Sequence, residues 1–446
     1  MAACPYRIER PNLTPNPTSM TITRFLLLAT LVPTAVAGAQ SDPVVESRAH
    51  YRAAVQAYEA RDLPAYLEHA REAQALRPAH GGVTYALASA FALTGDTAGA
   101  LATLRHFAVL GYAADLAADS DFVRLRGSDA YAELTRRLQR NGEPVVASRA
   151  AFELPERELL IEGIAHDARD GVFYVGSVRQ AKLFRVARDG AVSEFAAGEA
   201  GRWAPLGLRV DRKRGALWVA TAALPQTAGY TPSDSGRSAI LRYDLRSGRL
   251  TARYDAPADG APHVIGDLIV TRGGEVYATD SRAPVLYRVP ARGDTLERLV
   301  ESPLLLSAQG LALTPDERSL YVADYARGIL RVDLRGRSVS PVEAADSVLA
   351  LGIDGLYFHR GSLVGIQNGV APHRVVRFTL SPAGDRLLRA EVLERAHPRH
   401  HEPTLGALVD GELYYVANSQ WDRFGEDGRI ANPESLEPTA VLRLRL

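Results

Sequence analysis

A short pattern is repeated six times between Glu162 and Leu446. Each copy begins with a short segment of alternating apolar residues beside a glycine. A second such segment follows and, in most copies, a third. The clearest copy runs from Ser307 to Leu334 and turns at Pro315-Asp316. Successive copies begin 44, 60, 43, 45 and 51 residues apart, close to the ~40–50 residues of one four-stranded blade. The repeat predicts a mainly β fold, with a six-bladed β-propeller over residues 149–446.

The last copy ends on its third strand, so its blade lacks an outer strand. Arg149 to Leu154, just before the first copy, can supply that strand and close the ring, which removes exposed sheet edges. The longest spacing comes from an insertion at residues 222–237, a loop rich in Gly, Pro and Ser with Tyr230 at its centre. We expect this loop on the rim where the inner strands begin, either as a lid over the pore or as a mobile surface loop.

Residues 43–141 have a different pattern, rich in Ala and Leu with a helical period. Two helix starts, with Asp62 and Asp96 as N-caps, are 34 residues apart, which is the tetratricopeptide period. The segment resembles about two tetratricopeptide-like repeats and a capping helix, joined to the propeller by a linker at residues 141–148. It is either a groove that binds a protein partner or a structural appendage.

The N-terminal 40 residues match a secretory signal peptide, with a basic start, the apolar run Phe25 to Ala37 and small residues at the cleavage site. Met20 is a plausible true start, and the lone cysteine, Cys4, lies before it. We expect an exported protein, periplasmic or secreted, with no membrane span after cleavage; the alternative is an N-terminal anchor. Basic and acidic residues number 52 each and are mixed along the chain, so we expect no nucleic acid partner.

One column of residues carries the candidate chemistry, because the residue before each repeat's glycine is expected to point into the central tunnel. Oxygen donors without Cys or His select a hard divalent cation, Ca²⁺ before Mg²⁺. The alternative is a set of solvated pore residues or turn formers. In blade order the column reads Glu162, Leu206, Gly266, Gln309, Asp354 and Leu405.

The propeller segment resembles the family of senescence marker protein (regucalcin), gluconolactonase and luciferin-regenerating enzyme. The motifs that carry the resemblance are Glu162-Gly163, Gln309 to Ala312, Pro315-Asp316, Leu320 to Asp324 and Asp354-Gly355. It implies a divalent cation, usually Ca²⁺, held by Glu162, Gln309 and Asp354. It also implies hydrolysis of a lactone or related ester, with Asp354 as general base.

Two positions depart from the family pattern. Gln309 stands where the family has Asn, and Gly266-Asp267 stands where it has Asn-Asp. Asp267 either turns inward in place of the missing amide or braces the turn.

Further candidates for a small-molecule substrate follow the second strands and the loop before the last blade. Asn368 and Asn418 end two of the second strands, where their amides either orient a polar ligand or cap turns. The stretch HPRHHEP is either a solvated loop or a loop from which His401 or Glu402 reaches the rim as an acid or base. The substrate-binding set that we expect is Asp267, Asn368, Asn418, Tyr230 and His401.

The N-terminal segment and the column predict an exported propeller that binds a divalent cation, and the resemblance implies that it hydrolyses a lactone or related ester. The alternative is a non-catalytic propeller that binds a ligand or protein, with the helical segment as a recruitment unit.

Overall fold

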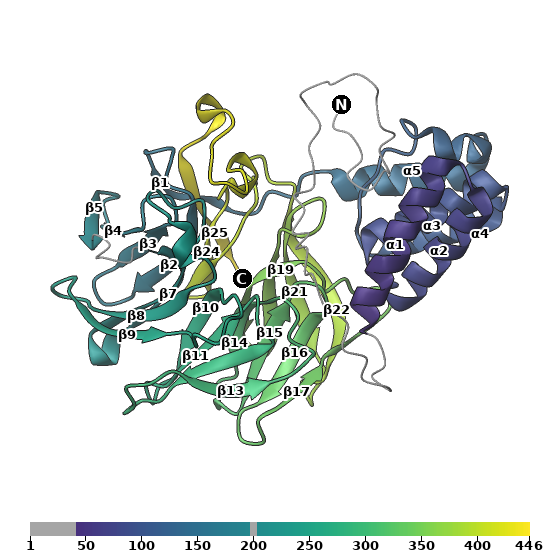
Figure 1. The fold of residues 1–446 in the computed structure, drawn as a ribbon. Helices are drawn as coiled ribbons and strands as arrows, with labels where there is room; N and C mark the ends of the chain where they lie inside the picture. Colours follow the sequence, from purple (N-terminus) through teal and green to yellow (C-terminus); the bar gives the residue numbers. More distant parts are fainter. Residues whose placement is uncertain (1–41, 197–202) are drawn as a thin grey trace. The chain divides into compact units, whose positions relative to one another are not determined.

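The computed structural model describes residues 42–196 and 203–446, and Figure 1 shows its fold. The chain divides into two compact units, Met1–Glu143 and Pro144–Leu446. The expected signal peptide, its alternative start at Met20 and Cys4 lie outside the described residues. Within those residues, no helix is both long and apolar enough to cross a membrane.

The first unit is all-helical, as the sequence predicts. Asp62 and Asp96 are N-caps whose carboxylates accept the backbone N–H of Ala65 at 3.1 Å and of Gly99 at 2.8 Å. The buried rings of Tyr58 and Tyr66 meet edge to face between the first two helices. The helices are α1 (Pro43–Ala60), α2 (Leu63–Leu76), α3 (Gly81–Thr94), α4 (Thr97–Val109), the 3₁₀ turn η1 (Ser120–Leu125) and α5 (Asp129–Gly142).

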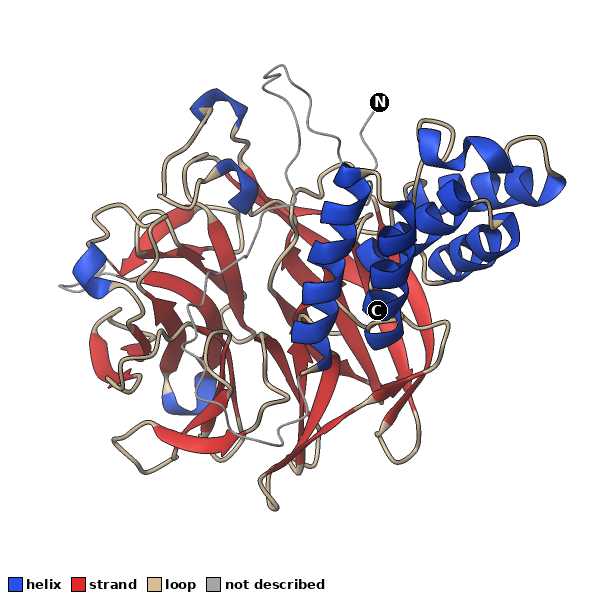
Figure 2. Cartoon of the chain, turned by 45° about the vertical axis from the view of Figure 1, so that its right-hand side comes forward, coloured by secondary structure: helices blue, strands red, loops and turns tan. Residues whose placement is uncertain are grey.

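The second unit consists of six sheets, which are antiparallel apart from one short extra strand; their strands are drawn in red in Figure 2. Blades 1 to 3 are built from β2 (Ile161–Asp167), β3 (Val172–Ser177), β4 (Lys182–Val186) and β5 (Val192–Ala196); β6 (Ala204–Asp211), β7 (Ala216–Ala222), β8 (Ser238–Asp244) and β9 (Leu250–Asp255); and β10 (Ile265–Val270), β11 (Val276–Asp280), β12 (Val285–Val289) and β13 (Glu297–Glu301).

Blades 4 and 5 are built from β14 (Ala308–Leu313), β15 (Ser319–Asp324), β16 (Gly328–Asp333) and β17 (Ser338–Pro341); and β19 (Ile353–His359), β20 (Ser362–Gln367), β21 (Arg374–Leu380) and β22 (Arg386–Arg395). A short extra strand of blade 5, β18 (Glu343–Ala344), runs parallel to β22. Blade 6 combines β23 (Gly406–Val409), β24 (Glu412–Val416) and β25 (Thr439–Arg445) with β1 (Arg149–Leu154).

The ring is closed as the sequence predicts. β1 pairs with β25 as the outer strand of blade 6, with Leu154 opposite Thr439 and Arg149 opposite Arg443. Leu154 is fully buried in a cluster with residues of blade 1 and of β24 and β25. The first and the last strands of the unit therefore lie side by side in one sheet.

The six inner strands surround a central tunnel. One cavity of about 280 Å³ is lined by residues from all six of them, among them Ile164, Arg209, Ile269, Leu311, Tyr357 and Gly406. These residues follow the column positions along each inner strand, so the cavity lies toward the far end of the tunnel from the column.

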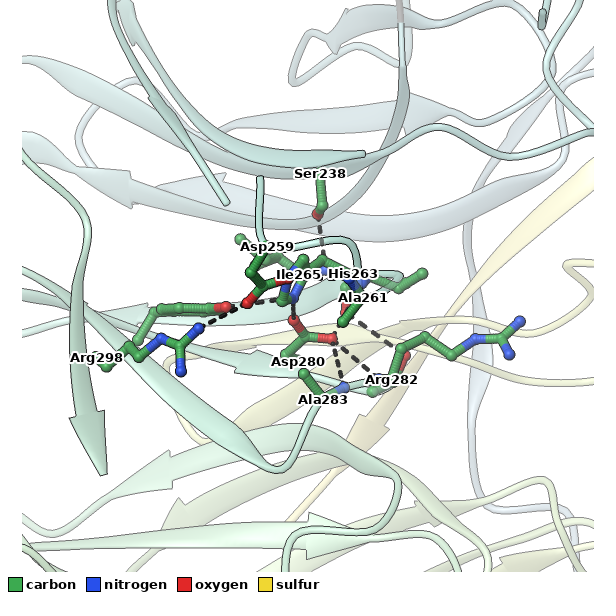
Figure 3. A network of polar contacts seen from close by, with 12 residues as sticks. Ser238, Asp259, Ala261, His263, Ile265, Asp280, Arg282, Ala283 and Arg298 are labelled. Atoms are coloured by element: carbon green, nitrogen blue, oxygen red, sulfur yellow. Dashed lines mark hydrogen bonds and ion pairs between the residues drawn. The ribbon is translucent and has the colours of Figure 1, made fainter. Parts of the chain in front are cut away.

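A buried polar network anchors the start of blade 3 (Figure 3). His263 is only 2% exposed; its Nδ1 lies 2.7 Å from Asp280 Oδ2 and its Nε2 lies 3.1 Å from Asp259 Oδ1. Asp280 also accepts three backbone N–H groups, and Arg298 donates to Asp259 at 2.7 Å. Ser238 of blade 2 accepts the N–H of Ile265 at 2.8 Å, which connects the network to the neighbouring blade.

Candidate functional site

A β-bulge near the start of the inner strand aims the column residues of five blades into the tunnel. In blades 1 to 5 the pairing with the second strand shifts register across the column residue and its successor, as between Ile161 and Ile164. A bulge leaves a residue outside the ladder and redirects its side chain. The glycine in the bulge lets blades approach, since a Cβ on Gly163 would lie 1.9 Å from Leu206 O.

Glu162 stands at the rim of blade 1 and is held by a residue of blade 6. Trp421 Nε1 donates to Glu162 Oε2 at 2.6 Å. Thr404, which lies just before the first strand of blade 6, donates its hydroxyl to the Glu162 carbonyl at 2.8 Å. The carboxylate of Glu162 is therefore fixed across the seam where the ring closes.

Asp354 stands at the rim of blade 5 and is 8% exposed. Asn368, at the end of the second strand, donates Nδ2–H to Asp354 Oδ2 at 2.8 Å. Tyr325 of blade 4 donates its hydroxyl to Asn368 Oδ1 at 3.1 Å. This chain of contacts orients the Asp354 carboxylate, and it brings together two residues that the sequence predicts for the site.

The rim carboxylates raise one another's pKa values. Burial, then the charge of Asp354, raises the pKa of Glu162 well above its usual range. Burial raises the pKa of Asp354 to about 7, against the hydrogen bond from Asn368 and with help from the charge of Asp267. Burial and the charges of Asp354, Glu402 and Glu162 also raise the pKa of Tyr325. The tunnel mouth is thus a buried acidic site that a positive charge would stabilise.

Glu402 lies close enough to this site for its charge to act on Tyr325, in line with the first of the two alternatives that the sequence left open for its loop. Burial and then the charge of Asp422 raise its pKa to about 7. Its backbone has φ 62°, a conformation that is costly for a non-glycine residue and that concentrates at functional sites. Its neighbour His401 has Nε2 2.8 Å from Asp422 Oδ1. The loop packs against blade 6 at this point, since His400 Nε2 also lies 2.8 Å from the Tyr415 hydroxyl.

Gln309 lies on the column but turns its amide along its own strand. Nε2 donates to Ser307 Oγ at 3.2 Å. Its Oε1 is the one heavy atom within 4 Å of a Cβ built on Gly266, at 3.8 Å. The longer side chain of Gln309 therefore lies over the space that Gly266 leaves empty, so the two departures from the family pattern adjoin in space.

Asp267 occupies the place in the blade 3 bulge that glycine occupies elsewhere, and its side chain braces the blades. Its Oδ2 accepts Arg209 Nη2 of blade 2 at 3.2 Å and the Leu311 N–H of blade 4 at 3.3 Å. Burial raises its pKa, while Arg209 opposes the shift. Of the two roles that the sequence left open for Asp267, the contacts are those of a brace.

Asn418 and Tyr230 make structural contacts. Asn418 donates Nδ2–H to Pro438 O at 3.0 Å and accepts the Ala440 N–H at 2.7 Å, so its amide caps the last strand. Tyr230 packs on an apolar cluster of Trp203, Ala223 and Ala239. The amide of Asn418 is thus bonded to the backbone at both its nitrogen and its oxygen. Of the two asparagines, it is Asn368 that contacts the acidic site.

The long loop after β7 reaches the rim through Leu224. Leu224 and Trp421 pack on a cluster that contains the column residue Leu206. Gln226 donates to Gly425 O at 3.1 Å, and Arg179 donates to Gln226 O and Gly428 O. The loops of blades 2 and 6 thus form one apolar cap beside the acidic site.

The donor chemistry suits a hard cation in part. Glu162 and Asp354 supply carboxylate oxygens, and their pKa values are raised first by burial and then by neighbouring negative charge. Gln309, the third ligand that the resemblance implies, is bonded to Ser307. No three His, Cys, Asp or Glu side chains in residues 42–196 and 203–446 converge closely enough to hold a metal by themselves.

The fold and the rim define a six-bladed β-propeller with an acidic tunnel mouth, preceded by a small helical unit. No protein-family model matches the chain, and no curated protein matches its sequence.

Solved propellers resemble the second unit. A gluconolactonase from Xanthomonas campestris is 18% identical with a TM-score of 0.45, over 68% of this chain and 97% of that one. A luciferin-regenerating enzyme is 17% identical with a TM-score of 0.46, over 68% and 96%. The calcium-binding protein regucalcin from Agrobacterium tumefaciens is 16% identical with a TM-score of 0.46, over 67% and 93%. The likeness is one of fold, and the function is argued from the rim residues.

Proposed function

We propose that the acidic rim hydrolyses a lactone or a related carboxylic ester with the help of a divalent cation, Ca²⁺ before Mg²⁺. The observation that carries this proposal is the Glu162 and Asp354 pair. Two blades bring these carboxylates to one tunnel mouth, where burial raises both pKa values. Buried carboxylates with raised pKa values concentrate at functional sites.

The proposed chemistry assigns each rim residue a role. A cation bound by Glu162 and Asp354 would polarise the ester carbonyl and stabilise the oxyanion. Asp354, with a pKa of about 7, takes a proton from the attacking water as the new C–O bond forms. That proton then goes to the alkoxide that leaves as the ester C–O bond breaks. The N–H groups of Asn368 and Trp421 hold the two carboxylates in place.

The walls of the site favour a substrate with one apolar and one polar side. Leu206, Leu224 and Trp421 form the apolar side, and Asn368 with the Tyr325 hydroxyl forms the polar side. A small ring ester with hydroxyl groups on one edge fits this division. The proposal includes export to the periplasm or the medium, directed by residues 1–40. It also includes a protein partner that binds the helical unit.

A thermal melt and a hydrolysis assay test the proposal. Ca²⁺ should raise the melting midpoint over an EDTA-treated sample, and Asp354→Ala should abolish the rise. On a panel of lactones, Asp354→Ala should lose about 10²-fold or more of the native rate. If Ca²⁺ and Mg²⁺ leave the midpoint unchanged, the cation part of the proposal is wrong.

The orientation of Gln309 favours a second candidate, a binding propeller without catalysis. Its amide is engaged by Ser307, so the cation site would have one protein ligand fewer than the resemblance implies. A calcium-dependent rise in the midpoint without hydrolysis of any lactone would select this candidate.

A further inference from the structure

Two histidines meet on neighbouring helices of the helical unit. His50 is on α1 and His69 is on α2, and their Nδ1 atoms lie 3.4 Å apart. The ring centroids are 5.7 Å apart and the ring planes make an angle of 41°. One turn away, Ser47 Oγ donates to Ala73 O at 2.7 Å, a buried bond that fixes the register of the two helices.

The separation of the two nitrogens matches that of two ligands on one metal ion. With Zn–N bonds of ~2.0–2.1 Å and a tetrahedral angle, two coordinating nitrogens lie about 3.3 Å apart. Without an ion, two imidazoles that face each other through nitrogen make one hydrogen bond, and they repel when both are protonated. The pair is thus already at the distance that a shared ion requires.

We propose that His50 and His69 form a transition-metal site on the seam between α1 and α2. Imidazole nitrogens suit Zn²⁺, Cu²⁺ or Ni²⁺, whereas the oxygen donors of the rim suit a harder cation. No third His, Cys, Asp or Glu of the described chain is placed to hold the ion with them, so water would complete the coordination.

Two carboxylates strengthen the case, because they lie one turn from the histidines on the same helix faces. Glu46 precedes His50 by four residues, and Glu72 follows His69 by three. Negative charge at this distance raises the local concentration of a divalent cation. An ion held across the seam would join α1 to α2.

Calorimetric titration of Zn²⁺ into the metal-free full chain tests the site. We expect a binding event that is at least about tenfold weaker in His50→Ala and in His69→Ala, since even outer-shell changes cost metal sites 10–100-fold. His106→Ala is the matched control in the same unit, because His106 Nε2 contacts Pro78 O at 3.0 Å and no histidine. Alanine favours helix, so these variants should keep the fold.

Zn²⁺ should also raise the midpoint of the helical melt, followed at 222 nm, in the native chain and in His106→Ala but not in His50→Ala/His69→Ala. Asp354→Ala should retain both effects, which separates this site from the rim. The proposal is overturned if the double variant binds Zn²⁺ like the native chain, or if the native chain shows no binding event that the double variant lacks.

Discussion

Asp354 is held in the fold at a cost in stability, because its pKa of about 7 in the folded state is above the ~3.9 of an unfolded chain. A group with a raised folded pKa binds a proton more readily when folded, so its ionised form opposes folding above that pKa. The stability of the metal-free protein is therefore expected to fall as the pH rises from about 4 through 7. The carboxylate that we propose for the chemistry therefore lowers the stability of the fold when no cation is bound.

Replacing Asp354 with asparagine should remove the cost of burying this charge. In EDTA at pH 8, Asp354→Asn should raise the free energy of unfolding by at least about 1 kcal/mol, because one pKa unit corresponds to about 1.4 kcal/mol. Urea unfolding followed by fluorescence measures it. Asp346→Asn, a change at an exposed aspartate, is the control and should have no effect. A loss of stability in Asp354→Asn would contradict the assignment.

Gln309→Asn should tighten calcium binding. An asparagine is one methylene shorter, so its amide cannot keep the bond to Ser307 Oγ and remains nearer the tunnel axis. We expect a larger calcium-induced shift in the melting midpoint than in the native protein. Ser307→Ala frees the amide without shortening it and serves as the comparison. An unchanged or smaller shift in Gln309→Asn would count against a role for this position in cation binding.

The sequence predicts the column positions but not the partners of each column residue. Glu162, Gln309 and Asp354 follow from the repeat alone, because equal places in equal blades meet on one axis. Trp421 lies 259 residues from Glu162 along the chain, and no local pattern connects them. Asp267 takes a glycine place in the bulge, where its carboxylate finds Arg209 on another blade. Such contacts depend on the closed ring.

Within single elements, the polar network at the start of blade 3 is held together by one imidazole. His263→Ala removes the ring between Asp280 and Asp259 (Figure 3). Asp280 would keep its three backbone N–H donors but lose its buried bond to the ring, so we expect a loss of about 2 kcal/mol. Asp259→Asn, at the outer end of the network, should cost less. Chemical unfolding of both variants measures the difference, and equal losses would disprove the argument.

Helix α3 carries a pH-dependent cap. His80 is its N-cap, and Nδ1 accepts the Val83 N–H at 3.4 Å. Burial lowers the pKa of His80 to about 3, below the ~6.5 of an unfolded histidine. The unfolded chain therefore binds more protons between these values, and stability should fall as the pH drops below about 6.5.

His80→Asn should flatten this pH dependence, because asparagine caps without titrating. The native slope approaches about 1.4 kcal/mol per pH unit for one proton. Urea unfolding followed at 222 nm between pH 7.5 and pH 5 measures it, and His106→Asn in the same unit should keep the native slope. If His80→Asn and the native protein lose equal stability on acidification, the cap is not the titrating group.

The elements themselves are predictable where local chemistry decides them. Asp62 and Asp96 cap the expected helices, and Pro315-Asp316 turns between the expected strands. The histidine-rich loop was the harder case, because its composition indicates solvent. His400 and His401 instead find Tyr415 and Asp422, contacts that exist only once blade 6 is assembled.

At the scale of the whole molecule, ring closure should determine whether the propeller is stable by itself. A chain that begins at Pro144 keeps β1, whereas one that begins at Pro155 lacks it and exposes an edge of β25. We expect the first to unfold in one cooperative transition as a monomer, and the second to be less stable and to associate. Size-exclusion chromatography and chemical unfolding compare the two. Equal behaviour would show that β1 is dispensable.

Six blades and their closure could be counted from the sequence because each blade repeats one local pattern and β1 supplies the missing strand. The short strand β18, the apolar cap of Leu224 and Trp421, and the join between the loops of blades 2 and 6 could not. Each of these features comes from a segment that occurs in one blade only. The sequence offers no second copy with which to align it, so its position in the fold could not be predicted.

The pairing of β1 with β25 also sets the order of events during synthesis. β1 is the first strand of the propeller to be made, and β25 is the last. The first five blades can each form from neighbouring hairpins, but the join between Leu154 and Thr439 must wait for nearly the whole unit. Contacts between such distant parts of a chain form slowly. Until they form, the edges of β1 and β24 are open to other chains, so we expect the chain to be most prone to association just before its last strand is made.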